Sequence, residues 1–577
     1  MPTRTREIII LTMFGALAGL AFYSLFEWMN IARGFSTVTL GITVFAVCFF
    51  GGALKMTGPI PLKDTLLPVA GFSVVVSGLI LWASLRFPDA QAFLDTGHPF
   101  AVVAVIFLIG IPFLVAAIQP DASPANYVDL FDISWGAITR LLVSAAFTGM
   151  FWLLLLLSNQ LLSLVGISVI EIMIEADAVP AVLTGAVFGM AIAVAYELSE
   201  MFSPQLILRL LRLLMPMITT VVAIFVAALP FRGISNLFGE LSAGAVMMGM
   251  GLIATSLVSA SIDRTSAQGV QRKWMKGFVQ LLAYLIPILG GLSIAAVWLR
   301  IDDYGWTPDR LVAITVAFIV LAYGIVYTFA VLRRGNWDDR LRQGNIALAL
   351  GVVSITALWL TPVLNPQAIS TKSQIARLDS GESLDKLPLY EMAHDWGHAG
   401  TSEFSKLKAR FEASDDAEAL EIIAAAQSAT YRYQFSRRKR DQEREQQIAR
   451  LDDVIIVHPN RDILPSELFI GAPSSYQPII HNCLGNDQNC VLISVPKIEE
   501  QAAHFILFTN LDNERSTMWS FTRKSAEETF NRSRQIKLDP ATKQDLRNGV
   551  YTIGRPRWSS VQLEGVNIHR GPLLDAE

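Results

Sequence analysis

Charged residues are scarce in this chain. Only 17% of its 577 residues are charged and 52% are apolar, whereas an average globular chain is about 25% charged. The charges that exist cluster between long apolar runs and in the last third of the sequence. This composition excludes an ordinary soluble protein and indicates an integral membrane protein.

Cysteine is nearly absent, and three residues are too few for a disulfide scaffold. Cys48 lies inside an apolar run and is interpreted as a small buried hydrophobic residue. Cys483 and Cys490 bracket the turn sequence LGNDQN between two expected strands. They predict a disulfide, which would persist only in an oxidising compartment, with two free thiols as the alternative.

Motifs of known chemistry are also lacking. The chain has no phosphate-binding glycine loop and no Gly-x-Ser-x-Gly elbow. His394 and His398 have the spacing that places two imidazoles on one helix face, where they could bind a metal. No third ligand is evident and Gly397 weakens the helix, so packing or surface histidines are favoured. We predict no metal, no cofactor and no catalytic residues, and the sequence favours a protein that is not an enzyme.

Long apolar runs dominate the first two thirds of the chain. A membrane span needs about 20 mostly apolar residues, and eleven runs come close to or exceed this length. They are Ile8–Phe26, Thr37–Ala53, Thr65–Leu85, Phe100–Ile118, Ile138–Val165, Val179–Tyr196, Leu210–Leu229, Leu241–Ile262, Phe278–Leu299, Leu311–Leu332 and Asn345–Val363.

The basic residues of the loops predict the orientation of these spans. Lys and Arg gather at the N-terminus and in most even-numbered loops, which the positive-inside rule places in the cytoplasm. The fourth loop, which is acidic, is the exception. The N-terminus is therefore expected inside, and eleven crossings place the C-terminal part in the periplasm. We expect a membrane bundle over 1–365, a helical neck over 366–450 and a soluble α+β domain over 451–577.

Ionisable residues are almost absent from the centres of the runs, and the exceptions lie at the ends. Glu197 and Glu200 share one helix face, and Arg209 and Arg212 follow across a short loop. One interpretation is that these inner-interface charges form a salt-bridged inner gate. The favoured interpretation is that they are interfacial charges that help to set the topology.

Small residues at four-residue spacing allow helices to approach closely. They occur at Gly15-x-x-x-Gly19, Gly185-x-x-x-Gly189 and Ala245-x-x-x-Gly249. Packing within one bundle is favoured over homodimerisation, and the sequence leaves the oligomeric state open.

The last third has the patterns of a folded soluble part. Helices are expected over Ser370–Leu378, Tyr390–Trp396, Phe404–Phe411, Asp415–Gln427 and Ala526–Ser533, and strands over Val454–Val457, Gln477–His481, Val491–Val495, Phe505–Phe508, Met518–Phe521, Val550–Ile553 and Ser560–Leu563.

A basic cluster, composed of Arg437, Arg438, Lys439 and Arg440, stands apart in this soluble part. It could contact anionic lipid or an acidic envelope polymer, although a solvated helix face is favoured. Nucleic acid is implausible as a partner of an external domain.

One stretch after the last run carries a resemblance. Eleven apolar runs followed by ISTKSQIARLDSG resemble a bacterial membrane family known as domain of unknown function 4153 (DUF4153), whose members share the pattern S-x-x-S-Q-x-x-R-L-x-x-G. The region around Asp395, Trp396 and Gly397 fits the same layout. The resemblance implies a bacterial inner-membrane location and brings no reaction. The pattern corresponds to Ser370, Ser373, Gln374, Arg377, Leu378 and Gly381.

The sequence therefore predicts an α-helical polytopic bundle followed by an α+β domain. The favoured function is an envelope-associated binding, sensing or scaffold protein. A transporter or flippase for an amphiphilic or lipid-linked substrate is the alternative. A membrane enzyme that acts on a lipid-linked sugar is the third, with Glu27, Glu171 or Glu175 as its carboxylate.

Overall fold

The chain folds into two compact units, 1–428 and 429–577. The computed structural model describes residues 3–31, 36–57, 60–197, 205–232, 243–333, 335–459, 465–469, 477–485, 490–495, 503–513, 515–523, 529–552, 560–563 and 566–569. The boundary falls inside the expected neck over 366–450, because the helices up to Ser428 belong to the first unit.

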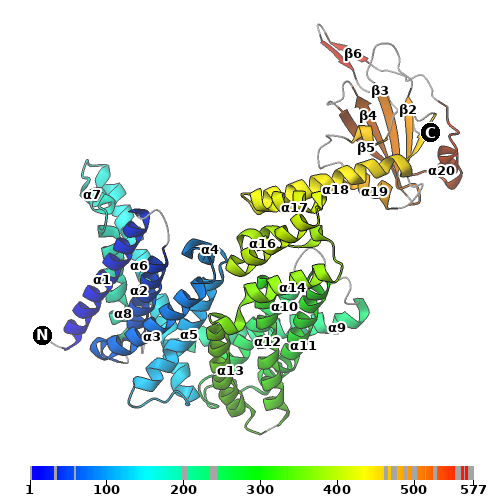
Figure 1. Ribbon diagram of the computed structural model, residues 1–577. Helices are drawn as coiled ribbons and strands as arrows, with labels where there is room; N and C mark the ends of the chain where they lie inside the picture. The colour runs from blue at the N-terminus through cyan, green and yellow to red at the C-terminus, as the bar shows by residue number, and fades with distance from the viewer. Residues whose placement is uncertain are drawn as a thin grey trace. The chain divides into compact units, whose positions relative to one another are not determined.

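The first unit is built from long apolar helices (Figure 1). Within the described ranges, eleven of them are long and apolar enough to cross a membrane, which confirms the eleven predicted runs. They are α1 (Thr3–Ile31), α2 (Thr37–Met56), α3 (Leu62–Ser84), α5 (His98–Ile118), α6 (Tyr127–Ser163), α8 (Val179–Glu197), α9 (Gln205–Arg232), α10 (Ala243–Ile262), α11 (Lys273–Tyr304), α12 (Pro308–Leu332) and α13 (Trp337–Trp359). Two short helices, α4 (Ala90–Asp95) and α7 (Val169–Glu175), lie between them.

Helices α1 and α8 pack through two of the predicted glycine motifs. A Cβ atom on Gly15 would lie 2.1 Å from the carbonyl oxygen of Gly185, and one on Gly189 would lie 2.2 Å from that of Leu11. Because the obstacle on each side is backbone, no side chain can move away to make room. Within this chain the two motifs therefore pack against each other. The third motif differs, since a Cβ on Gly249 would meet nothing within 4 Å.

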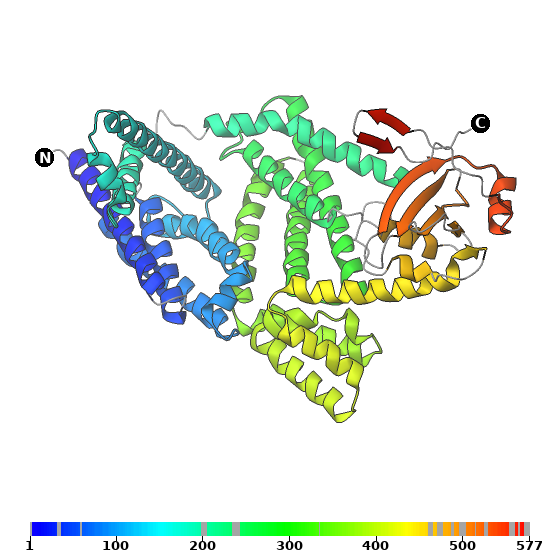
Figure 2. The same cartoon turned by 90° about the horizontal axis from the view of Figure 1, so that it is seen from above.

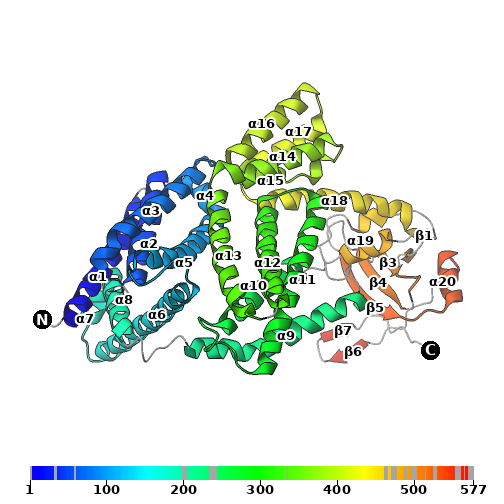
Figure 3. The same cartoon turned by 90° about the horizontal axis from the view of Figure 1, so that it is seen from below.

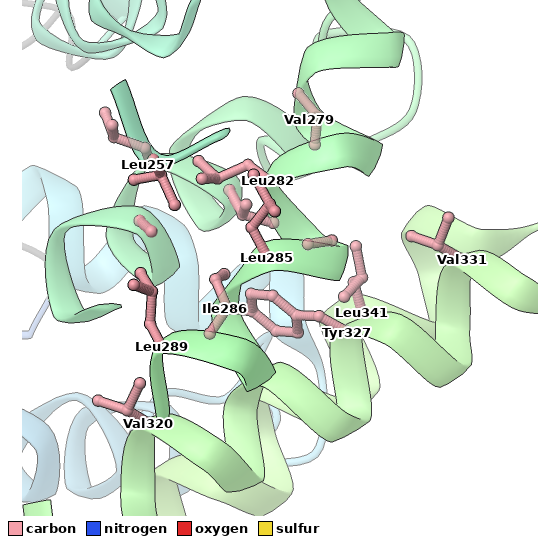
Figure 4. Packing of buried hydrophobic residues seen from close by; sticks show 14 of the residues in the cluster. Leu257, Val279, Leu282, Leu285, Ile286, Leu289, Val320, Tyr327, Val331 and Leu341 are labelled. Atoms are coloured by element: carbon pink, nitrogen blue, oxygen red, sulfur yellow. The ribbon is translucent and has the colours of Figure 1, made fainter. Parts of the chain in front are cut away.

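A central apolar cluster is formed by side chains from the five helices α9, α10, α11, α12 and α13. It includes Leu282, Ile286 and Leu289 of α11 together with Val320 and Tyr327 of α12, all of them buried. Figure 4 shows part of this cluster, with Ile286 beside the ring of Tyr327. The close approach of α11 and α12 again depends on glycine, because a Cβ on Gly324 would lie 2.5 Å from the backbone nitrogen of Pro287.

Four helices of the first unit follow the last span and lie across one end of α11, α12 and α13 (Figure 3). We call them the helical layer. They correspond to the four helices expected between Ser370 and Gln427. Among the described residues after the last span there are also the 3₁₀ turns η2 (Pro362–Leu364), η3 (Leu384–Lys386) and η4 (Pro465–Leu468). The layer comprises α14 (Pro366–Asp379), α15 (Leu389–His394), α16 (Gly397–Ala413) and α17 (Ala417–Ser428).

The second unit is an α+β domain (Figure 2). Its five-stranded sheet has the order β1-β2-β3-β4-β5, with β1 parallel to β2 and the other neighbours antiparallel. A two-stranded sheet pairs β6 with β7. The elements are α18 (Arg432–Val454), β1 (Ile456–His458), α19 (Gln477–Leu484), β2 (Val491–Val495), β3 (Ala503–Thr509), β4 (Ser516–Arg523), β5 (Thr529–Ile536), α20 (Pro540–Arg547), β6 (Ser560–Leu563) and β7 (Val566–His569).

Alternation along β2 distributes its side chains between two cores. Leu492 packs with Leu451 of α18 and Cys483 of α19 on one face. Val491 and its neighbour two residues on, Ile493, pack with Leu546 of α20 on the other. Successive side chains of a strand point to opposite faces, so helices cover both sides of the sheet.

The structure corrects three elements expected in this domain. The expected strand Gln477–His481 lies in helix α19, whose Ile479 and Ile480 are buried in the core. The helix expected near Ala526–Ser533 is wrong from Thr529 on, since Thr529–Ile536 forms strand β5 against β4, and its first three residues lie outside the described residues. Val550 and Tyr551 of the expected strand Val550–Ile553 have no strand structure. For Thr529–Ile536, the pairing with β4 outweighs the local helical pattern.

We expect Gly15→Ala to lower the stability of the bundle by about 1–3 kcal/mol, since the new methyl group overlaps backbone across the α1–α8 contact. Thermal unfolding of the detergent-solubilised protein measures the effect. Gly78→Ala is the matched control, because a Cβ there meets nothing within 4 Å and alanine favours a helix. Equal unfolding midpoints for the two variants would contradict the packing described.

Candidate functional site

The helical layer is attached to the bundle by the side chains of α14. The Gln374 amide nitrogen donates to the carbonyl oxygens of Tyr304 and Trp306, each at 2.9 Å. The Ser373 hydroxyl accepts a hydrogen bond from the backbone N–H of Trp306 at 3.2 Å. Two residues of the predicted family pattern thus bind the backbone between α11 and α12.

Arg377 extends this attachment by one turn of α14. Its guanidinium donates to the carbonyl oxygen of Asp303 at 2.7 Å and to the carboxylate of Glu382 at 2.9 Å. Gly305 makes the approach possible, because a Cβ there would lie 2.7 Å from both Gln374 and Arg377. Its φ of +72° also favours glycine where α11 ends. We call Ser373, Gln374 and Arg377 with their backbone partners the α14 clamp.

A second contact joins the layer to the other side of the bundle. Arg86, just after α3, donates to the carbonyl oxygens of Trp359 at 3.2 Å and Thr361 at 2.6 Å. Its own carbonyl oxygen accepts the N–H of His398 at 2.8 Å. A Cβ on Gly397 would lie 2.3 Å from that oxygen, so the glycine permits the contact. The layer is therefore held at two places. The first uses residues of the family pattern on α14, and the second uses Gly397 of the other region that resembles the family.

The remaining residues of the pattern lie on the same helix and just after it. Ser370 is fully buried, and its hydroxyl has no hydrogen-bond partner. Leu378 is half-buried near the end of α14. Gly381 has a φ of +101°, and its N–H donates to the carbonyl oxygen of Leu378, which ends the helix.

At the opposite end of α11, an ion pair joins α9 to the end of α10. The Arg212 guanidinium of α9 bonds to the Asp263 carboxylate and donates to the carbonyl oxygen of Ala260 at 3.1 Å. Only 15% of the Arg212 side chain and 7% of the Asp263 side chain are exposed. Arginine here neutralises both a buried carboxylate and the negative end of a helix dipole.

Arg342 of α13 binds the same helix end. It donates to the carbonyl oxygens of Ile262 at 2.7 Å and Asp263 at 3.2 Å, and it pairs with Asp339 at 2.6 Å. Asp263 itself adopts a φ of +53° at the end of α10. Three spans, α9, α10 and α13, are thus joined by charges. Arg342 and Asp263 are 79 residues apart in the chain, and sequence inspection did not pair them.

A neutral polar group lies next to this network. The Tyr327 hydroxyl is 2.8 Å from the hydroxyl of Ser259 and donates to the Asn345 side chain at 2.7 Å. Asn345 in turn donates to Ser259 at 3.3 Å. These groups satisfy one another, so they reinforce the contact of α10, α12 and α13.

Of the predicted inner-interface charges, Arg212 makes the ion pair described above, whereas Arg209 is exposed. The Glu197 side chain and all of Glu200 lie outside the described residues. The carboxylates considered for chemistry on a lipid-linked sugar, Glu27, Glu171 and Glu175, are exposed.

The two candidate metal-binding histidines do not share a helix. His394 ends α15, and its ring packs in a tilted arrangement against Tyr390, with 4.7 Å between the ring centroids. A ring nitrogen of His394 also contacts the carbonyl oxygen of Ala426 at 3.1 Å. His398 lies in the first turn of α16. Among the described residues, no group of three or more His, Cys, Asp or Glu side chains could hold a metal ion.

In the second unit, Cys483 and Cys490 form a disulfide, with their Cα atoms 5.4 Å apart. Both side chains are buried in the core that α18 and α19 share with the sheet. The basic cluster lies on α18, where Arg437 and Arg440 are exposed and the side chains of Arg438 and Lys439 lie outside the described residues.

The chain matches the model of a known family. The family described as a domain of unknown function, DUF4153, matches residues 39–395. The match covers more than half of the chain and includes Arg86, the α11–α12 connection and α14. No curated protein and no solved structure matches the chain.

We expect Arg212→Met to destabilise the bundle by about 3–5 kcal/mol, because it leaves the buried Asp263 carboxylate without its partner. Adding Asp263→Asn should restore part of the loss by removing the unpaired charge. The midpoint of thermal unfolding in detergent measures both effects. Arg209→Met, an exposed arginine one turn earlier on α9, should be nearly neutral. Equal losses for the two arginine variants would rule out a special role for the pair.

The stability of the helical layer should depend on pH through Glu382. Hydrogen bonds from Lys386 and Arg377 lower the pKa of this carboxyl from 4.5 to about 2. The carboxylate therefore stabilises the fold fully above about pH 4.5 and progressively less as the pH falls toward 2. We expect wild type to unfold at a higher temperature than Glu382→Gln at pH 6, and this difference in midpoint should shrink below pH 4.5.

Glu403→Gln, which removes an exposed pair with Lys406, is the control. A difference between wild type and Glu382→Gln that does not change with pH would refute a stabilising role of the Glu382 carboxylate.

Proposed function

This chain belongs to the DUF4153 family, and on that premise we propose that it is an envelope-associated binding or sensing protein. In this proposal the membrane bundle lies in a bacterial inner membrane with its N-terminus in the cytoplasm. The helical layer and the C-terminal α+β domain are in the periplasm.

The α14 clamp is the observation that supports a sensing role most directly. Gln374 and Arg377 bind main-chain atoms rather than flexible side chains, so the layer follows any movement of α11 and α12. A simple anchor needs only one span and no such attachment. Rigid coupling suits a protein that passes a binding event between its extramembrane part and its bundle.

Two further observations support the periplasmic placement. The basic loops give the orientation by the positive-inside rule. The disulfide between Cys483 and Cys490 is a bond that persists in oxidising compartments and is rare in the cytosol. The two arguments are independent, because one uses loop charges in the bundle and the other uses chemistry in the second unit.

Paired fusions test this placement. A phosphatase that is active only in the periplasm should be active when fused after Glu577, and a fluorescent protein that matures only in the cytoplasm should be dark there. The matched control is the same pair fused after Gly335, between the tenth and eleventh spans, where the outcome should be reversed. A fluorescent fusion at Glu577 would overturn the periplasmic placement and the envelope role with it.

A further inference from the structure

Lys55 is a buried cation near the end of α2. Only 6% of its surface is exposed. Its ammonium donates to the carbonyl oxygen of Leu108 on α5 at 3.2 Å and lies 5.3 Å from the centre of the Phe107 ring. An ammonium has three donors, and these contacts use one of them.

Arg140 of α6 lies beside Lys55. Its guanidinium donates to the carbonyl oxygen of Lys55 at 3.4 Å and lies 5.7 Å from the ring of Tyr196 on α8. Among the described residues, no carboxylate lies within 4.0 Å of either cation. The residues next to them in the sequence, Leu54 and Leu141, belong to one packed apolar cluster.

This arrangement is electrostatically incomplete. A buried charge costs several kcal/mol unless it is paired, and two neighbouring cations also repel each other. Charged residues within spans normally pair and mark a functional site. A further unpaired group lies one turn along the same face of α6, since the Ser144 hydroxyl is fully buried and has no partner. An anion beside Lys55 and Arg140 would accept hydrogen bonds from both cations, and the Ser144 hydroxyl is one helical turn from Arg140.

We propose that Lys55 and Arg140, assisted by Ser144, form a binding site for a phosphate group. Arginine and lysine are the usual protein ligands of phosphate. The site lies where α2 and α8 end, at the level of a membrane interface, since Tyr196 is the last residue of its span. This is the depth of lipid headgroups, and Tyr196 is 37% exposed.

The surface of α6 suits the apolar part of such a ligand. Beyond Arg140, the helix exposes large apolar side chains over several turns, including Phe147, Met150, Leu153 and Leu157. An amphiphile could place its phosphate at Arg140 and its chains along this surface. The inference does not rest on the proposed function, because it concerns the bundle alone and holds for either location of the second unit.

Native mass spectrometry of the full chain in detergent tests the site, with thermal shift as a second readout. The probes are phosphatidylglycerol, zwitterionic phosphatidylcholine and inorganic phosphate. We expect phosphatidylglycerol to bind wild type and raise its unfolding midpoint, and Lys55→Met with Arg140→Met to weaken binding at least tenfold. The matched control replaces two exposed cations, Lys63→Met with Arg209→Met, and should bind as wild type does.

The probes distinguish the source of the phosphate group. Preference for phosphatidylglycerol supports a lipid headgroup, whereas saturable binding of inorganic phosphate that the double variant abolishes supports a free anion. If the double variant does not fold, Arg140→Lys, which keeps the charge, should weaken binding less than Arg140→Met does. If the variant that lacks Lys55 and Arg140 binds phosphatidylglycerol as well as the variant that lacks Lys63 and Arg209, the proposed site is overturned. Tighter binding in Glu197→Gln with Glu200→Gln also overturns it, because it would mean that a carboxylate of the chain already neutralises the cations.

Discussion

The hydrogen bonds from Gln374 and Arg377 to the backbone at the end of α11 are the interaction on which the architecture of the first unit depends. The last four carbonyls of a helix have no partner within the helix, and α14 supplies donors at this point. The helical layer is thereby attached to main-chain atoms of the bundle. Gly305 suits this point, because its φ of +72° favours glycine and the missing Cβ leaves room for the side chains of Gln374 and Arg377.

The opposite end of the bundle uses the same chemistry with different residues. Arg212 and Arg342 bind the last carbonyls of α10 and compensate Asp263. Charges in a membrane protein are costly unless paired, and here they join α9, α10 and α13 at one point. Lys55 and Arg140 follow the opposite pattern, since no carboxylate pairs with either among the described residues. Because of that difference, we assign a ligand to Lys55 and Arg140, and a structural role to the network around Asp263.

Much of the fold could be predicted from the sequence because its signals are local. Apolar runs of sufficient length gave the eleven spans, and small residues at four-residue spacing indicated close helix packing, although not that α1 and α8 are the partners. The charge network could not be predicted, because Asp263 and Arg342 are far apart in the chain and each resembles an interfacial charge. Strand β5 was mistaken for a helix because only its pairing with β4 determines its conformation. The role of Gln374 was likewise hidden, since its partners are backbone atoms that carry no sequence signature.

The attachment of the helical layer can be measured directly by electron paramagnetic resonance in lipid bilayers. Spin labels at Arg300→Cys, near the end of α11, and Ala413→Cys, at the end of α16, are both at exposed positions. Cys48→Ser removes the free thiol, and Cys483 and Cys490 are already joined. We predict one narrow distance distribution, because the α14 clamp makes the layer and the bundle a single body. A broad distribution, or several separate distances, would contradict the account.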